Sequence, residues 1–164
     1  MKKSHLYIDL EQTVLTQWNI DDDTKREFRF QIGSKSIAER CFLQYPPTPY
    51  EAENAILIIE DEIMPVAKKI LHDYPLFTSD KEWMEAVDSV NMNRVEKLTR
   101  EEIEMLFNRL SAIITGRPVS SDNLPEDTRF AAKMFILREI MHHFNFPEIN
   151  FEREGSLFYK NNDS

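Results

Sequence analysis

The sequence predicts an α+β fold in which an N-terminal antiparallel sheet of three to four strands packs against about four helices. Three observations predict this fold. Apolar and polar residues alternate along residues 1–45, as they do in strands that are buried on one face. Signals that begin helices recur after residue 47. Because the strands precede the helices, separate layers are favoured over repeated strand–helix–strand units.

Residues 13–20 and 26–32 have the clearest strand pattern. In the second segment, Phe28, Phe30 and Ile32 fall on the same side of an extended chain. The acidic sequence DDDTK between the two segments is typical of a hairpin turn. Residues 5–10 and 36–45 are weaker strand candidates, and the resulting sheet has one apolar face that helices must cover.

The first helix is predicted to begin after Thr48, which forms a capping box with Glu51 around Pro49. Apolar residues then follow at helical spacing to about residue 71. Pro65 lies inside this pattern, and its ring nitrogen cannot donate the helical hydrogen bond to the residue four positions earlier. A kink is therefore expected there.

Two further capping boxes predict two more helices. Ser79 with Glu82 begins a short helix, and Thr99 with Glu102 begins a longer helix that has a single apolar stripe. Gly116 ends the longer helix, as glycine often does just beyond the last helical turn.

The last helix is predicted to run from Pro125 to about Phe144 and to be the central helix of the fold. On a helical wheel, apolar side chains fill most of its circumference, and only a narrow strip with Glu139 and His143 is left for water. A helix of this kind is usually buried on nearly all sides. Its apolar arc contains Phe130, Met134, Leu137, Ile140, Met141 and Phe144.

Length and composition predict one domain over residues 1–160, because 164 residues with 41% apolar content can bury a core without disulfides. Residues 1–45 are expected to be mainly β and residues 48–145 mainly α. Residues 146–160 are expected to add a strand or hairpin. Residues 161–164 are expected to form a frayed tail.

The chain has 29 acidic and 20 basic residues, which give a formal net charge of −9. This charge repels phosphate backbones, so nucleic acid is not an expected partner. No apolar run reaches the roughly 18 residues of a membrane helix, and the N-terminus does not resemble a secretory signal. We therefore expect a cytoplasmic protein that binds a protein partner or self-associates, without nucleic acid or membrane.

No catalytic, cofactor or metal motif is recognisable in the sequence. The 3 glycines are not spaced as in a phosphate-binding loop. Cys41 has no neighbouring base in the sequence that would activate it. Glu139 and His142 have the spacing of one half of a di-iron site, but the second copy of that motif is absent. The sequence therefore predicts no cofactor, no metal site and no catalytic residue.

Arg138 is the most informative charged residue, because the wheel places it inside the apolar arc of the last helix. An unpaired guanidinium buried there costs several kcal/mol. Glu60 lies on the flank of the apolar face of the first helix, so we expect Arg138 and Glu60 to meet where the two helices cross. Glu62 is the substitute partner. His142 lies one turn beyond Arg138 and is expected to join them.

Arg138, His142 and Glu60 are thus the candidate ligand-binding residues, with two interpretations. In the first, they form an internal ion pair that fixes the register of the helices. In the second, Arg138 binds a small anion while His142 or Glu60 transfers a proton. Because no catalytic motif is present, the sequence favours a non-enzymatic adaptor or regulatory protein–protein interaction domain. A small enzyme or ligand-binding domain is the alternative.

Overall fold

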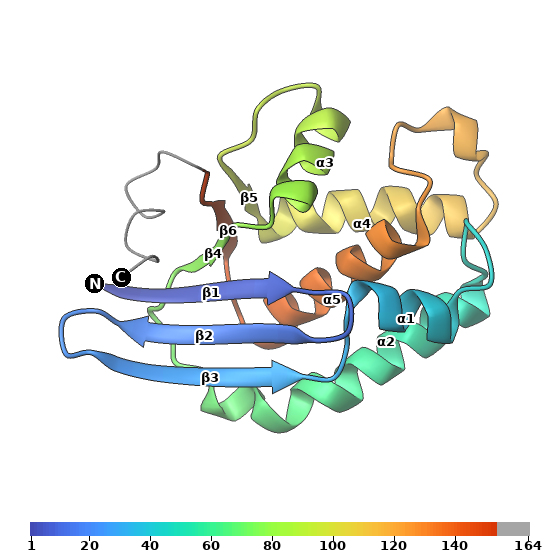
Figure 1. Cartoon of the computed structure of the whole chain (residues 1–164). Helices are drawn as coiled ribbons and strands as arrows, with labels where there is room; N and C mark the ends of the chain where they lie inside the picture. Colours follow the sequence, from blue (N-terminus) through green and yellow to red (C-terminus); the bar gives the residue numbers. More distant parts are fainter. Residues whose placement is uncertain (154–164) are drawn as a thin grey trace.

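A computed structural model describes residues 1–153, which contain one mixed sheet of six strands and five α-helices (Figure 1). The α+β class is therefore confirmed. The strands are β1 (Lys2–Ile8), β2 (Thr13–Asn19), β3 (Thr24–Phe30), β4 (Leu76–Thr78), β5 (Lys97–Thr99) and β6 (Glu148–Phe151). The helices are α1 (Ser34–Cys41), α2 (Pro49–Ile63), α3 (Lys81–Asn91), α4 (Arg100–Ile114) and α5 (Thr128–His143), with 3₁₀ helices η1 (Met64–Lys69) and η2 (Val119–Ser121).

The strand order across the sheet is β3-β2-β1-β4-β6-β5. Strands β1 to β3 form an antiparallel meander, whereas β4 is parallel to both β1 and β6. The edge strand β5 is antiparallel to β6. After β1, the chain adds β2 and β3 on one side of the sheet. After β4, it adds β5 and β6 on the other side. The point between β1 and β4 is therefore a topological switch point, where open sheets commonly bind ligands.

The predicted strand number was too low, because β4 and β5 are too short to show an alternating pattern. The weak strand prediction for residues 36–45 was also wrong. This segment contains most of α1, whose buried residues Ser34, Ile37, Ala38 and Cys41 follow helical spacing. The extra strand predicted near residue 148 is present as β6. The remaining predictions for residues 154–160 and for the tail lie outside the described residues.

Two of the three predicted capping boxes are confirmed. The Thr48 hydroxyl accepts a hydrogen bond from the Glu51 amide, and the Thr99 hydroxyl accepts one from the Glu102 amide. The third was misplaced by one residue, because the Asp80 carboxylate caps α3 by accepting from the Trp83 amide at 3.1 Å. Each cap supplies an acceptor for an amide that has no partner within its helix.

At two positions, the effect of proline differs from the predicted effect. The α-helix that was expected to kink at Pro65 ends at Ile63 and continues as the 3₁₀ helix η1. Pro125 does not begin the last helix. That helix begins at Thr128, and the Asp127 carboxylate accepts a hydrogen bond from the amide of the second helical residue at 2.9 Å.

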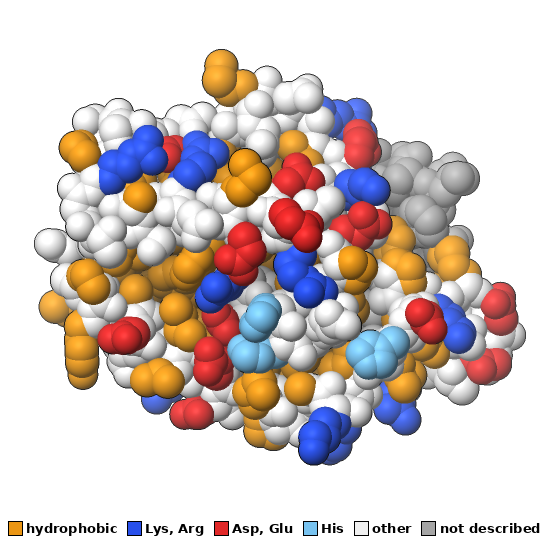
Figure 2. Space-filling view, turned by 180° about the vertical axis from the view of Figure 1, so that it is seen from behind, with side chains coloured by type: hydrophobic (Ala, Val, Ile, Leu, Met, Phe, Trp, Pro, Cys, Tyr) orange, Lys and Arg blue, Asp and Glu red, His pale blue; other side chains and the backbone are white. Residues whose placement is uncertain are grey.

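Seen from behind, the surface mixes hydrophobic, acidic and basic side chains (Figure 2). Within residues 1–153, no helix combines the length and the apolar character that crossing a membrane requires.

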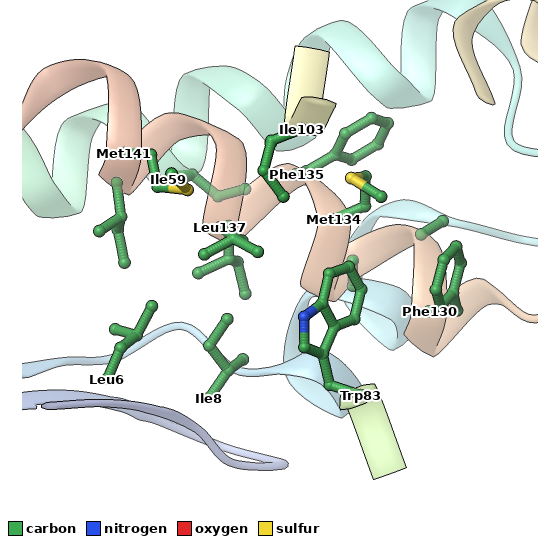
Figure 3. Close-up of a cluster of buried hydrophobic side chains, with 14 of the residues drawn as sticks. Leu6, Ile8, Ile59, Trp83, Ile103, Phe130, Met134, Phe135, Leu137 and Met141 are labelled. Atoms are coloured by element: carbon green, nitrogen blue, oxygen red, sulfur yellow. The ribbon is translucent and has the colours of Figure 1, made fainter. Parts of the chain in front are cut away.

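The prediction that α5 is central is confirmed. It packs against α1, α2 and α4, and its side chains Met134, Leu137 and Met141 are fully buried. Figure 3 shows Leu137 pointing toward the β1 side chains Leu6 and Ile8, and Met141 beside Ile59 of α2. One detail of the prediction was wrong. Glu139, which was assigned to the exposed strip, is only 2% exposed.

Candidate functional site

A pocket of about 330 Å³ opens at the carboxyl ends of β1 and β4. Its walls are the last residues of β1 with the turn that follows, and the N-terminal turns of α1, α3 and α5. It therefore lies at the switch point of the sheet, where ligand sites of such sheets are found. Its volume lies at the lower end of the range of small-molecule sites.

Gly33 shapes one wall of this pocket by allowing α1 to approach the turn after β1. A Cβ atom at Gly33 would lie 2.4 Å from the Leu10 carbonyl oxygen and 2.6 Å from that of Asp9. The first amides of α1 use this proximity, because Ser34 donates to the Asp9 carbonyl and Lys35 to the Leu10 carbonyl, each at 2.9 Å. These donors are therefore occupied by the protein's own backbone.

Lys133 and Asp80 form a largely buried ion pair at the pocket. The Lys133 ammonium lies 2.7 Å from Asp80 Oδ2, and their side chains are 12% and 11% exposed. The other oxygen of Asp80 caps α3. Since Lys133 lies on α5 and Asp80 follows β4, this pair links two walls of the pocket and holds an ammonium group beside the switch point.

Trp83 contributes an aromatic side chain to the pocket. Its ring stacks on Phe130 at 5.4 Å between centroids, and Figure 3 shows the two side by side. The indole N–H has no hydrogen-bond partner among the described residues. An unpaired buried donor is uncommon in native proteins and often marks a functional position.

The lining of the pocket contains both signs of charge. Acidic residues outnumber basic ones, although two of the acids, Asp80 and Asp127, have capping roles that account for their position. The acidic residues are Asp9, Asp80, Glu82 and Asp127, and the basic residues are Arg129 and Lys133.

Arg138, the candidate predicted from the sequence, is paired with other residues than expected. Its Nε lies 2.8 Å from Glu104 Oε1 and one terminal nitrogen lies 2.9 Å from Glu139 Oε1. The guanidinium also lies over the Phe107 ring, 4.3 Å from its centroid. Burial lowers the pKa of Arg138, but the two carboxylates outweigh this effect and raise the pKa above its usual value.

The other two candidates do not join Arg138. Glu60 approaches His143, at 3.7 Å, and the substitute Glu62 accepts a hydrogen bond from the Gln31 amide. His142 is exposed, whereas His143 Nε2 lies 3.0 Å from Glu139 Oε2. A helical wheel indicates which way a side chain points but not which helix packs there. The structure shows that the partner of Arg138 on another helix, Glu104, belongs to α4 rather than to α2. None of the three candidates lines the pocket at the switch point.

Sequence reasoning missed Lys133, although a signal for it existed. Lys133 belongs to the same nearly apolar helix as Arg138, so it could have been identified as a second charge that needs a buried partner. The role of Gly33 had no such signal, because it depends on the approach of a turn more than twenty residues away in the sequence.

Comparison with known proteins gives structural matches only. The chain matches no family model and no curated protein. A Ppx/GppA family member from Aquifex aeolicus has a TM-score of 0.72 and 16% identity, over 99% of this chain and 56% of its own. An exopolyphosphatase from Cytophaga hutchinsonii has a TM-score of 0.68 and 10% identity, over 92% of this chain and 53% of its own.

These matches establish the fold, and the chain spans about half the length of the solved structures that it resembles. They also correct the functional prediction. A non-enzymatic adaptor or protein–protein interaction domain was favoured, but the structures that share this fold are described as phosphatases and exopolyphosphatases. The chain therefore shares the fold of solved structures that are described as phosphatases and exopolyphosphatases.

Proposed function

We propose that this chain is a phosphatase-like domain that binds the phosphate groups of a small anionic molecule in the pocket at the switch point. The observation that carries the proposal is the buried ammonium of Lys133 at that pocket. One solved structure with this fold is described as an exopolyphosphatase, and this supports a chain of linked phosphates as the ligand. We also propose that the protein is located in the cytosol.

Lys133 and Arg129 are the groups that would hold the phosphates. Lys133 lies deep in the pocket, and Arg129 is exposed in the first turn of α5 at its rim. An ammonium and a guanidinium both form charge-assisted hydrogen bonds with phosphate oxygens. The N-terminal ends of α3 and α5 add positive partial charge at the same place.

The acidic residues of the pocket favour a ligand that arrives as its magnesium complex. Mg²⁺ is commonly held by one or two carboxylates together with substrate phosphates, and it keeps several waters. Such a complex has a smaller negative charge than the free polyphosphate. It is therefore compatible with the net charge of −9, which disfavours nucleic acid.

Hydrolysis is the second part of the proposal, with Asp9 as the general base. Asp9 follows β1 and lines the pocket, and one of its carboxylate oxygens accepts a hydrogen bond from the Leu10 amide at 2.8 Å. A water molecule attacks the terminal phosphorus and gives a proton to the carboxylate. The P–O bond between the terminal phosphorus and the bridging oxygen breaks, and the shortened polyphosphate leaves with the electron pair of that bond.

Lys133→Met is expected to weaken binding of magnesium tripolyphosphate by roughly 10- to 100-fold, because a hydrogen bond to a charged group contributes about 1.5–3 kcal/mol. Titration calorimetry on the whole chain measures this loss. The matched control is Lys81→Met, since Lys81 is an exposed lysine at the start of α3 that does not line the pocket. Circular dichroism verifies that both variants are folded.

Asp9→Asn separates the two parts of the proposal. It is expected to keep tripolyphosphate binding and to lose phosphate release. Equal affinity of wild type and Lys133→Met would contradict the binding site. Unchanged phosphate release by Asp9→Asn would instead contradict the assignment of the base.

A further inference from the structure

We propose that Glu60, Glu139 and His143 form a binding site for a divalent transition-metal ion, with Zn²⁺ as the best-fitting ion. Each residue offers one ligand atom, and these atoms all lie within 4.8 Å of one another. The site is separate from the phosphate pocket, which none of the three residues lines. It departs from the prediction, made from the sequence, that no metal site is present.

Two packed helices hold the three ligands. Glu139 and His143 are one turn apart on α5 and therefore lie on the same face of that helix. Glu60 belongs to α2, which packs against α5. Ligands on regular elements are positioned more precisely than ligands on loops.

The distances are close to those of a tetrahedral zinc site. His143 Nε2 lies 3.0 Å from Glu139 Oε2 and 3.7 Å from Glu60 Oε1. Zinc bonds of about 2.0–2.1 Å place neighbouring ligand atoms roughly 3.4 Å apart. The Glu60 and Glu139 ligand atoms are only known to lie within 4.8 Å of each other, so binding also requires the partly exposed Glu60 side chain to turn toward Glu139. His143 would have to carry its proton on Nδ1.

The charge of this cluster also favours a dication. Glu60, Glu104 and Glu139 provide three carboxylates, whereas Arg138 provides one guanidinium that contacts both Glu104 and Glu139. With a neutral His143, two negative charges lack a full positive partner within the cluster. By comparison, the Asp122 side chain, which is 3% exposed, has two arginines to balance its single negative charge. A divalent cation would balance the excess.

The site is open to solvent on one side. Glu139 is buried, but the Glu60 and His143 side chains are 36% and 21% exposed, so an ion has a route from water. On the face that Figure 2 shows from behind, histidine side chains lie beside acidic and basic side chains. Because His143 lies in the last turn of α5, the negative end of the helix dipole adds attraction for a cation.

The donor set selects the kind of ion. Imidazole suits zinc and other late transition metals, whereas Mg²⁺ and Ca²⁺ prefer oxygen ligands alone. Three protein ligands leave the fourth tetrahedral position for water. The ion would join α2 to α5 and would thus stabilise the folded chain.

The test is a titration of the whole metal-free chain with Co²⁺ and Zn²⁺. Tetrahedral Co²⁺ absorbs strongly in the visible range, and Zn²⁺ is expected to displace it and to raise the Tm. His143→Asn and Glu60→Gln are each expected to weaken binding more than about 100-fold. Both side chains are partly exposed, so both variants are expected to fold, and circular dichroism checks this.

His142→Asn is the matched control, because His142 is exposed and adjacent to His143 but is not one of the three ligands. This variant is expected to bind Co²⁺ like the wild type. Absence of the visible absorption in the wild type would overturn the proposal. So would an equal loss of affinity in His142→Asn, since that result would indicate nonspecific binding by surface histidines.

Discussion

Gly33→Ala is expected to destabilise the chain by roughly 2–4 kcal/mol, an estimate that rests on the loss of about three backbone hydrogen bonds. The added Cβ would lie 2.4 Å from the Leu10 carbonyl oxygen, a backbone atom that no side-chain rotation can move away. The turn after β1 must therefore separate from α1. The bonds at risk are those from Ser34, Lys35 and Ser36 to the Asp9 and Leu10 carbonyls. Urea unfolding measures the loss.

Gly116→Ala is the control for this prediction. Gly116 has a φ of +122° and no neighbouring atom within 4 Å of an added Cβ, so its substitution introduces backbone strain without a clash. Because Asp9 and Leu10 also line the pocket, only Gly33→Ala is expected to weaken tripolyphosphate binding as well. A stable Gly33→Ala variant with normal binding would show that the close approach of α1 is not required.

Phe135→Ala is expected to destabilise the chain by about 3–5 kcal/mol, as is typical when a large core aromatic residue is truncated. Phe135 is 1% exposed at the centre of α5. Its ring makes edge contacts with Phe42 at 5.8 Å and with Phe107 at 5.5 Å between centroids. The substitution leaves a cavity where α1, α4 and α5 meet, so thermal and urea unfolding should both record the loss.

Met105→Ala provides the comparison on a neighbouring helix. Met105 lies on α4 but is 65% exposed, so its truncation is expected to change stability by less than about 0.5 kcal/mol. Similar losses for Phe135→Ala and Met105→Ala would be incompatible with α5 as the central helix.

The parts of the fold that could be predicted are those with a local pattern. Strands β2 and β3 show alternation, and α2 and α4 show capping boxes followed by apolar stripes. The burial of α5 follows from its apolar circumference. In contrast, β4 and β5 are three residues long, and α1 has only two turns, so their patterns were too short to interpret.

The candidate site was less accessible to prediction, because it depends on contacts between distant segments. The inward direction of Arg138 follows from the wheel, but its partner Glu104 depends on how α4 packs on α5. The pocket depends on the parallel pairing of β1 with β4, which joins Ser4 to Leu76. No periodicity within a single segment reports that pairing, nor the packing of α5 that brings Lys133 to Asp80.

The central claim is that phosphate groups bind where β1 and β4 end. The most direct test is amide shift mapping by NMR during a titration with magnesium tripolyphosphate. We expect the largest shifts in residues 7–10, 80–83 and 127–133, and no comparable shifts around Glu104 and Arg138. Shifts confined to the neighbourhood of Arg138, or no shifts at millimolar ligand, would contradict the account.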